Sequence, residues 1–360
     1  MKIDGKHLQS IWYDRDSDKV KIIDQTLLPH EFKIVDLNNL SDARNAISSM
    51  KVRGAPLIGV TAAYGIYLAL KENPKQLETA LSELLNTRPT AINLKWALEK
   101  MHESLHGIEE ELLSQKALEI SLLMEKEDAS ICEAIGNHGL PLLQALWSKK
   151  KDHQECLNIL THCNAGALAA VDWGTALSVI YKTAAAGVPI HVWVDETRPR
   201  NQGASLTCWE LSKMGVSNTL IVDNAGGHLM QMGQVDVCVV GSDRTTRCGD
   251  VCNKIGTYLK ALAARASNIP FYAALPISTI DFSIGTGVGN IPIEERPADE
   301  VSHVCGIDET GQRSKLRIVE EGTRIKNYGF DITPAEFISG IITEKGVFQA
   351  NEISLRDALD

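Results

Sequence analysis

Four short runs of β-branched and aliphatic residues each end abruptly in polar residues, and this pattern constrains the fold of the 360-residue chain more than any other feature. The runs lie in LNILTHCNAGALA, IHVWVDETRPRNQGASL, TLIVDNAGGHLM and VVGSDRTTRCGDVCNKIG, between Leu157 and Gly256. Short buried strands that alternate with helix-length segments are typical of a parallel sheet with crossover helices. The sequence therefore predicts a Rossmann-like α/β sheet.

The polar residues that follow the four runs carry acid, thiol, hydroxyl and amide groups. They are, in chain order, His162 and Cys163, Asp195 and Glu196, Asp223 and Asn224, and Ser242 and Asp243. The carboxyl ends of parallel strands lie along one rim of an open α/β sheet, and ligands bind there. We therefore expect an active site at this rim.

The chain is long enough for two domains, which we expect at residues 1–150 and 151–360. Residues 1–36 contain short alternating runs that predict a small antiparallel sheet, and the segments from there to residue 150 have helical spacing. The first domain is thus expected to be mainly helical. The second is expected to contain five strands and a terminal helix that begins at Pro334.

Cys163 and Asp243 are the candidate reactive groups. We expect the NAGALA segment after Cys163 to open a helix that ends near Ala185, so that the helix dipole favours the thiolate. A buried structural cysteine is the alternative, because free cysteines are commonly buried. For Asp243, the alternative is a plain ion pair with Arg244. A thiol and a carboxylate on one rim would suit an acid/base pair that shuttles protons.

Two basic turns precede apolar helices in the first domain. VRGAPLIG predicts that Arg53, Gly54 and Ala55 lie at a helix N-terminus, where free N–H groups and the helix dipole favour an anion. Ordinary helix-entry chemistry explains the same residues without a ligand. TRPTAINLKWAL repeats the arrangement, with Arg88 ahead of a helix that we expect to start at Pro89.

Three further polar residues complete the candidate binding set. Asn253 and Lys254 are expected to open the helix after the fourth strand, and Gln202 lies in the charged loop after the second. Together they could hold hydroxyl groups or a phosphate.

Composition and absent motifs exclude several classes of protein. The net charge is -10 and no Lys/Arg run is dense, which argues against a nucleic-acid partner. No uncharged apolar stretch reaches about 18 residues, which argues against a membrane span. The segment MKIDGKHLQSIWYD lacks the apolar region of a secretory signal, so we expect a cytoplasmic protein whose eight cysteines form no disulfide framework.

Cofactor and metal motifs are also missing from the sequence. HCNAGALA lacks the G-x-G-x-x-G fingerprint of dinucleotide binding, and GTGVGN is not in a strand-to-helix context. There is no Walker A, G-x-S-x-G or H-E-x-x-H motif, and the Cys248/Cys252 pair alone is a weak metal signal. These absences argue against dinucleotide binding and against a metal site.

The motifs THCNAGALA, VWVDETRPRNQGASLT, DNAGG, GDVCNKIGTY and IPIEER resemble those of the methylthioribose-1-phosphate isomerase family, the aldose–ketose isomerases of methionine salvage. VRGAPLIG and TRPTAINLKWAL fit as well, so the resemblance spans nearly the whole chain. The wider family also holds ribose-1,5-bisphosphate isomerases and the regulatory subunits of the exchange factor for translation initiation factor two. The THCN and ETRPRNQG motifs favour the methylthioribose branch.

The resemblance implies a sugar-phosphate substrate, a homodimer, and no metal or organic cofactor. It also implies that Cys163 and Asp243 are the catalytic pair, with Asp243 acting at the C2 hydroxyl and Cys163 at C1 or the ring oxygen. The substrate contacts that it implies come from Arg53, Gly54, Ala55, Arg88, Gln202, Asn253 and Lys254. Proton and hydride routes both stay open at this point.

Two alternative functions also stay open. The first is an isomerase of a related 1-phosphopentose, such as 5-deoxyribose-1-phosphate or ribose-1,5-bisphosphate. The second is a non-enzymatic regulatory subunit of a translation factor, against which the presence of both Cys163 and Asp243 argues.

Overall fold

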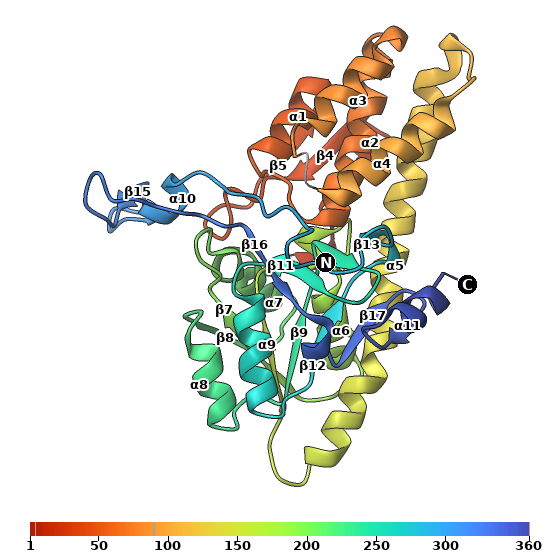
Figure 1. Ribbon diagram of the computed structural model, residues 1–360. Coiled ribbons are helices and arrows are strands. Elements are labelled where there is room, and N and C mark those ends of the chain that lie inside the picture. The colour runs from red at the N-terminus through yellow and green to blue at the C-terminus, as the bar shows by residue number, and fades with distance from the viewer. Residues whose placement is uncertain (4, 89–90, 360) are drawn as a thin grey trace.

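The computed structural model describes residues 1–3, 5–88 and 91–359 (Figure 1). A two-stranded hairpin, β1 (Lys2–Ile3) and β2 (Lys6–His7), precedes an antiparallel meander of β3 (Ile11–Asp14), β4 (Lys19–Ile23) and β5 (Ile34–Leu37). The small antiparallel sheet predicted at the start of the chain is therefore confirmed.

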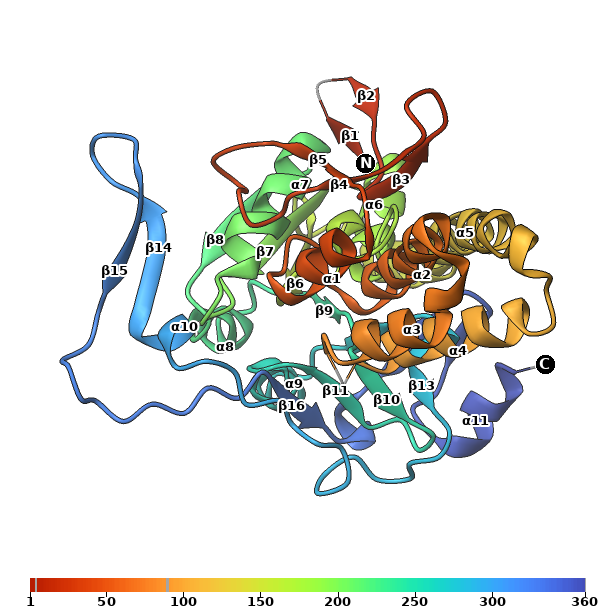
Figure 2. The same cartoon turned by 90° about the horizontal axis from the view of Figure 1, so that it is seen from above.

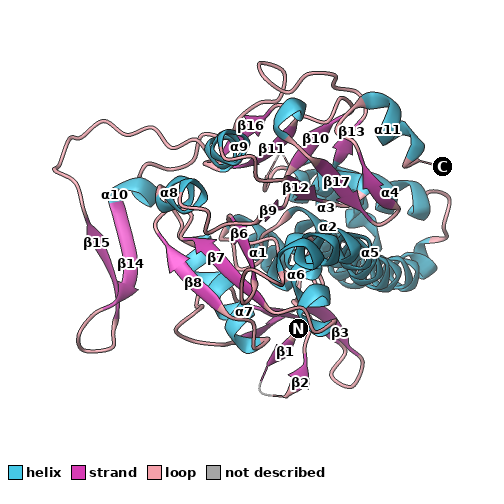
Figure 3. Ribbon diagram, turned by 90° about the horizontal axis from the view of Figure 1, so that it is seen from below, coloured by secondary structure: helices cyan, strands magenta, loops and turns pink. Residues whose placement is uncertain are grey.

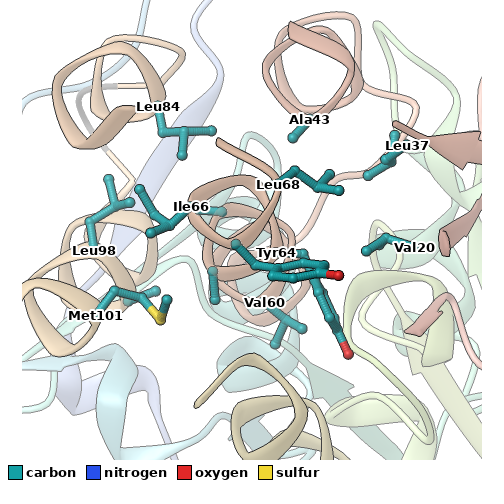
Figure 4. Close-up of a cluster of buried hydrophobic side chains, with 14 of the residues drawn as sticks. Val20, Leu37, Ala43, Val60, Tyr64, Ile66, Leu68, Leu84, Leu98 and Met101 are labelled. Carbon is teal, nitrogen blue, oxygen red and sulfur yellow. The ribbon is translucent and has the colours of Figure 1, made fainter. Parts of the chain in front are cut away.

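Helix α2 (Ala55–Glu72) is the centre of the N-terminal region. Its residues are buried without interruption from Leu57 to Leu70, as expected for a helix that is apolar on all sides. Around it pack the meander and the other helices of the region (Figure 4). Those helices are α1 (Leu40–Ser48), α3 (Leu77–Leu85), α4 (Ile92–Leu105) and α5 (Leu113–Lys150). Among the described helices, none combines the length and apolarity needed to cross a membrane.

Helix α5 extends along the whole molecule (Figure 1). Its N-terminal half, with Ile120 and Met124, packs into the core around α2. Its C-terminal half, with Ile135 and Leu143, packs instead on the main sheet of the C-terminal region. One helix therefore belongs to both cores.

The main sheet has seven strands in the order β18-β17-β12-β9-β6-β7-β8. All neighbours are parallel except β17 and β18. Figure 3 shows this layer with helices on both of its faces. The strands are β6 (Leu157–Thr161), β7 (Ile190–Asp195), β8 (Asn218–Ile221), β9 (Val237–Val240), β12 (Phe271–Ala274), β17 (Gly340–Thr343) and β18 (Gly346–Phe348). The Rossmann-like sheet predicted from the four runs is confirmed.

Alternate residues of β6 enter different cores, as the two-residue period of a strand requires. Ile159 packs in the core that contains α5 and α6 (Ala176–Ala185), together with α7 (Cys208–Lys213). Leu160 packs in the opposite core, which includes α8 (Ala225–Gln231) and α9 (Thr257–Ala266). Burial on both faces explains why the strands read as nearly continuous apolar runs.

The region after β9 is more strand-rich than the sequence predicts. A second, four-stranded sheet has the order β13-β10-β11-β16. Its strands are β10 (Arg244–Thr246), β11 (Val251–Lys254), β13 (Ile280–Asp281) and β16 (Phe330–Thr333). The hairpin of β14 (His303–Ile307) and β15 (Arg313–Arg317) projects away from the body of the molecule (Figure 2), and α10 (Asp299–Ser302) precedes it.

The terminal helix predicted at Pro334 is wrong. Pro334 precedes a single 3-10 turn, Ala335–Phe337, and the chain then enters β17 and β18 before the short helix α11 (Glu352–Asp357). The GIIT run forms a strand because it pairs in parallel with the edge of β12 that would otherwise be free.

Candidate active site

A small cavity opens at the carboxyl ends of β6 and β9, where the order of the sheet reverses. From β6 the chain passes to β7 and β8 on one side, then returns to β9 on the other, which creates a topological switch point. The cavity has a water-accessible volume of about 60 Å³. All nine predicted site residues line it, namely Arg53, Gly54, Ala55, Arg88, Cys163, Gln202, Asp243, Asn253 and Lys254.

Cys163 lies two residues beyond the end of β6, but the helix predicted directly after it is wrong. The chain forms a loop with one 3-10 turn, Ala167–Ala169, and α6 begins only at Ala176. The buried carboxylate of Glu210 accepts hydrogen bonds from the backbone N–H groups of Ala167 and Leu168 at 2.8 and 3.0 Å. These long-range bonds hold the loop in place of a local helix.

The environment of Cys163 therefore differs from the one expected of a helix N-terminus. Burial raises the pKa of the Cys163 thiol, while Lys254 and Arg53 lower it in part. The thiol lies 3.5 Å from Oε1 of Gln202, to which it donates. Cys163 is thus held as a neutral thiol at neutral pH, facing the amide of the next strand-end loop.

Asp243 follows β9 and faces the same cavity. Its pKa is raised by burial, and the cations of Lys254, Arg88 and Arg53 oppose that rise. The alternative of an ion pair with Arg244 is wrong, because the guanidinium of Arg244 binds Asp281 instead, with Nε 3.0 Å from Oδ2. The Asp243 carboxyl is left to the cavity.

Lys254 and Asn253 reach the cavity from a strand, which corrects the helix start predicted for them. Both lie in β11, which pairs with β10 on one side and β16 on the other, and α9 begins at Thr257. Lys254 is buried, and its ammonium lies 4.9 Å from the centre of the Phe330 ring. The buried Lys254 ammonium therefore lowers the pKa of both the Cys163 thiol and the Asp243 carboxyl in part.

Arg53, Gly54 and Ala55 lie at the N-terminus of α2, as predicted. Gly54 has a φ of 97°, and a Cβ there would come within 2.4 Å of the Ala169 carbonyl oxygen, so only glycine fits. The buried Arg53 guanidinium donates to Gln25 and to the Asn164 carbonyl. Its Nη2 finds no hydrogen-bond partner among the described residues. This buried donor remains available to an anion.

Arg88 donates from Nη2 to Oε2 of Glu294 at 2.8 Å. Glu294 comes from the IPIEER segment, and its other oxygen accepts from Arg296, also at 2.8 Å. This pair links the N-terminal helices to the loop after β13. The helix start predicted at Pro89 lies outside the described residues, and α4 is described from Ile92.

His162, Asp195 and Asp223 form a cluster whose possible ligand atoms lie within 4.8 Å of one another, with His162 and Asp195 buried and Asp223 partly buried. His162 already uses both ring nitrogens, at 2.8 Å from Asp195 Oδ2 and 2.8 Å from the Ile255 carbonyl oxygen. The ammonium of Lys260 lies 3.2 Å from Asp195 Oδ2. Because the Lys260 ammonium already supplies the positive charge beside Asp195, we interpret the cluster as an internal hydrogen-bond network that stabilises the strand ends.

Sequence reasoning missed three residues that shape the site: Glu210, Glu294 and Thr197. Glu210 and Glu294 act through partners that are distant in the chain. Thr197 lies in the ETRPRNQG motif, but nothing in the sequence shows where its hydroxyl points. Its Oγ1 accepts a hydrogen bond from the backbone N–H of Cys163 at 2.8 Å.

The fold and the cavity define a Rossmann-like α/β protein whose switch-point site combines a thiol, a carboxylate and buried cations suited to a small phosphorylated ligand. Residues 51–350 match the model of the initiation factor 2 subunit family. The chain is 55% identical over 357 residues to methylthioribose-1-phosphate isomerase of Methylorubrum extorquens, which covers 99% of this chain and 97% of that one. It is 52% identical over 358 residues to the Sinorhizobium medicae protein of the same name, with 99% and 98% covered.

Solved structures agree. A 5-methylthioribose 1-phosphate isomerase from Pyrococcus horikoshii OT3 superposes with a TM-score of 0.82 at 36% identity, over 98% of this chain and 96% of that one. The translation initiation factor eIF-2B, subunit delta, from A. fulgidus gives 0.82 at 38% identity, over 98% and 99%. The chain therefore belongs to the initiation factor 2 subunit family, on its methylthioribose-1-phosphate isomerase branch. The resemblance read from the sequence motifs is confirmed.

Proposed function

We propose that the chain converts 5-methylthioribose-1-phosphate to 5-methylthioribulose-1-phosphate in methionine salvage, with Cys163 and Asp243 as the acid/base pair. The observation that carries the proposal is the meeting of these two residues, from the ends of β6 and β9, in one cavity with Arg53 and Lys254. Relatives at 51 to 55% identity bear the name of this activity.

The phosphate of the substrate is assigned to the N-terminus of α2. The unpartnered Nη2 of Arg53 and the free N–H groups of the first helical turn would bind it, with Arg88 as a second cation. Charge-assisted bonds to an anion are stronger than neutral ones, and a helix N-terminus favours negative charge. Gln202, Asn253 and Lys254 are assigned to the sugar hydroxyls and the phosphate.

The reaction needs a proton donor at the ring oxygen and an acceptor at the C2 hydroxyl. The neutral thiol of Cys163 protonates the ring oxygen as the bond between C1 and that oxygen breaks. Asp243, with its raised pKa, takes the proton of the C2 hydroxyl as C2 becomes a carbonyl. The hydrogen bound to C2 ends on C1, and transfer of a proton from Asp243 back to the Cys163 sulfur restores the enzyme.

The cellular setting is part of the same proposal. The resemblance of the sequence motifs implies a homodimer that needs neither metal nor organic cofactor, and we extend the proposal to a cytoplasmic location. We also keep the division into residues 1–150 and 151–360 as a proposal. Separate apolar cores around α2 and around the main sheet support it, although α5 contributes to both.

A regulatory subunit of a translation factor is the second candidate, because the A. fulgidus structure named translation initiation factor eIF-2B, subunit delta, is similar over nearly the whole chain. The deciding experiment follows the purified protein by NMR with 5-methylthioribose-1-phosphate and no added metal or nucleotide. Conversion to the ketose supports the isomerase. If the folded protein does not convert this substrate but does convert 5-deoxyribose-1-phosphate or ribose-1,5-bisphosphate, the assignment moves to the substrate that is converted. Inertness toward all three would favour the regulatory role.

A further inference from the structure

Two threonine hydroxyls hold the backbone of Cys163 from opposite sides. Oγ1 of Thr197 accepts a hydrogen bond from the Cys163 N–H at 2.8 Å. Oγ1 of Thr207 donates to the Cys163 carbonyl oxygen at 2.6 Å. Thr197 follows β7, and Thr207 ends a π-helical turn, Gly203–Thr207, that leads into α7. The peptide groups on both sides of the reactive residue are therefore fixed by residues more than 30 positions away in the chain.

The conformation that these hydroxyls hold is an uncommon one. Cys163 has a φ of 66° and Thr197 a φ of 64°, both in the left-handed region that glycine favours. A β-branched residue there is a genuine outlier, at a cost of about 1–3 kcal/mol. Glycine or asparagine would suit the backbone of Thr197 better, but neither carries a hydroxyl. The hydroxyl of Thr197 is therefore the reason for a threonine at this position.

Each of the two hydroxyls donates one hydrogen bond and accepts another, so its direction is fixed. Thr197 Oγ1 accepts from Cys163 and donates to the Asp195 carbonyl oxygen at 3.0 Å. Thr207 Oγ1 donates to Cys163 and accepts from Nδ2 of Asn164 at 3.2 Å. Both threonines are at most 1% exposed. Loss of either hydroxyl would leave buried backbone groups of the strand-end loops without a partner.

We propose that Thr197 and Thr207 are positioning residues that hold Cys163 in its left-handed conformation and so aim its thiol at the substrate. The proposal rests on the function proposed above. The aimed thiol points toward Gln202 and stays within the influence of Lys254 and Arg53. A misplacement of about 1 Å in a reacting group costs on the order of 100-fold in rate, so a clamp on this backbone acts on turnover and not on binding.

The test compares Thr197→Val and Thr207→Val with Thr197→Ser and Thr207→Ser. The valine variants keep shape and remove the hydroxyl, and we expect kcat to fall by about 100-fold while KM stays close to wild type. The serine variants restore the hydroxyl and should recover most of kcat. Thr161→Val is the matched control, because Thr161 is equally buried in β6 and its hydroxyl bonds the Val239 carbonyl oxygen instead of Cys163.

Amide hydrogen exchange at Cys163, measured without substrate, tests the clamp independently of activity. The Cys163 amide should exchange faster in Thr197→Val than in wild type, Thr197→Ser or Thr161→Val. Unchanged exchange in Thr197→Val would overturn the clamp whatever the activity. Equal losses of kcat in the serine variants or in Thr161→Val would overturn the positioning role. If wild type lacks isomerase activity but the Cys163 amide still exchanges faster in Thr197→Val than in the other proteins, the proposed function fails and the clamp remains.

Discussion

Arg53 donates a hydrogen bond from Nη1 to the carbonyl oxygen of Asn164 at 2.7 Å, across 111 positions of the chain. The entry of α2 is thereby fixed to the loop that carries Cys163, and the guanidinium is held beside the thiol. A cation so placed can bind the phosphate of a substrate whose C1 lies near the reactive sulfur. The N-terminal helices are therefore a structural part of the candidate active site.

Removal of the Arg53 guanidinium is expected to weaken substrate binding. Arg53→Met should raise KM for the sugar phosphate by about 10- to 100-fold, because charge-assisted hydrogen bonds contribute about 1.5–3 kcal/mol. Arg53→Lys keeps the positive charge without the planar guanidinium and should give an intermediate KM. Steady-state kinetics measure both, with Arg15→Met, at an exposed arginine, as the control. An unchanged KM in Arg53→Met would refute the phosphate assignment.

Loss of either reactive group is expected to lower turnover with little change in KM. Cys163→Ser and Asp243→Asn should each lower kcat by about 100- to 10,000-fold, the usual range for a positioned acid or base. Cys156→Ser, which changes a cysteine outside the cavity, serves as the control. Wild-type turnover in Cys163→Ser would rule out the thiol as the proton donor.

Lys254 is expected to set the pH range of the reaction. Burial raises the pKa of Asp243 and of Cys163, and the Lys254 ammonium lowers both in part. Below the Asp243 pKa the carboxyl is protonated and cannot accept a proton, and above the Cys163 pKa the thiol has none to give. The plot of kcat/KM against pH should therefore be bell-shaped, and Lys254→Met should move both limbs to higher pH.

The substrate phosphate also titrates, with a pKa of about 6, but it does so equally with both enzymes. The difference between the two profiles therefore reports the protein groups. Lys126→Met, at an exposed lysine of α5, should leave the profile unchanged. A profile that Lys254→Met does not move, or moves to lower pH, would contradict the shared influence of Lys254.

Gly203 is expected to be essential for the folding of the loop after β7. A Cβ at Gly203 would lie 1.8 Å from the Asp195 carbonyl oxygen, which itself accepts the Thr197 hydroxyl. Gly203→Ala should lower the free energy of unfolding by about 3 kcal/mol or more. Gly227→Ala, where the added Cβ meets its nearest atom at 3.6 Å, should change it by no more than about 1 kcal/mol. Thermal unfolding compares the two variants, and similar melting temperatures would contradict the steric argument.

Much of the fold and of the candidate site was predictable from the sequence because the signals are local. Apolar runs of strand length mark β6, β7, β8 and β9, and in a parallel sheet the residues after such runs share one rim. The basic turn before an apolar segment likewise marks the start of α2. The strand ends that carry Cys163 and Asp243 could thus be read in advance, and with them the general position of the cavity.

The conformations inside the site were decided by partners that are distant in the chain. NAGALA is a loop because Glu210 accepts hydrogen bonds from two of its backbone N–H groups, and Asn253 extends a strand because it pairs with Asp331. Arg244 turns away from Asp243 because Asp281 binds it. Local periodicity reports which residues are buried, whereas hydrogen bonds and ion pairs need geometry that only the folded chain supplies. The sequence determined which groups reach the rim, and the tertiary structure decided how each of them is held there.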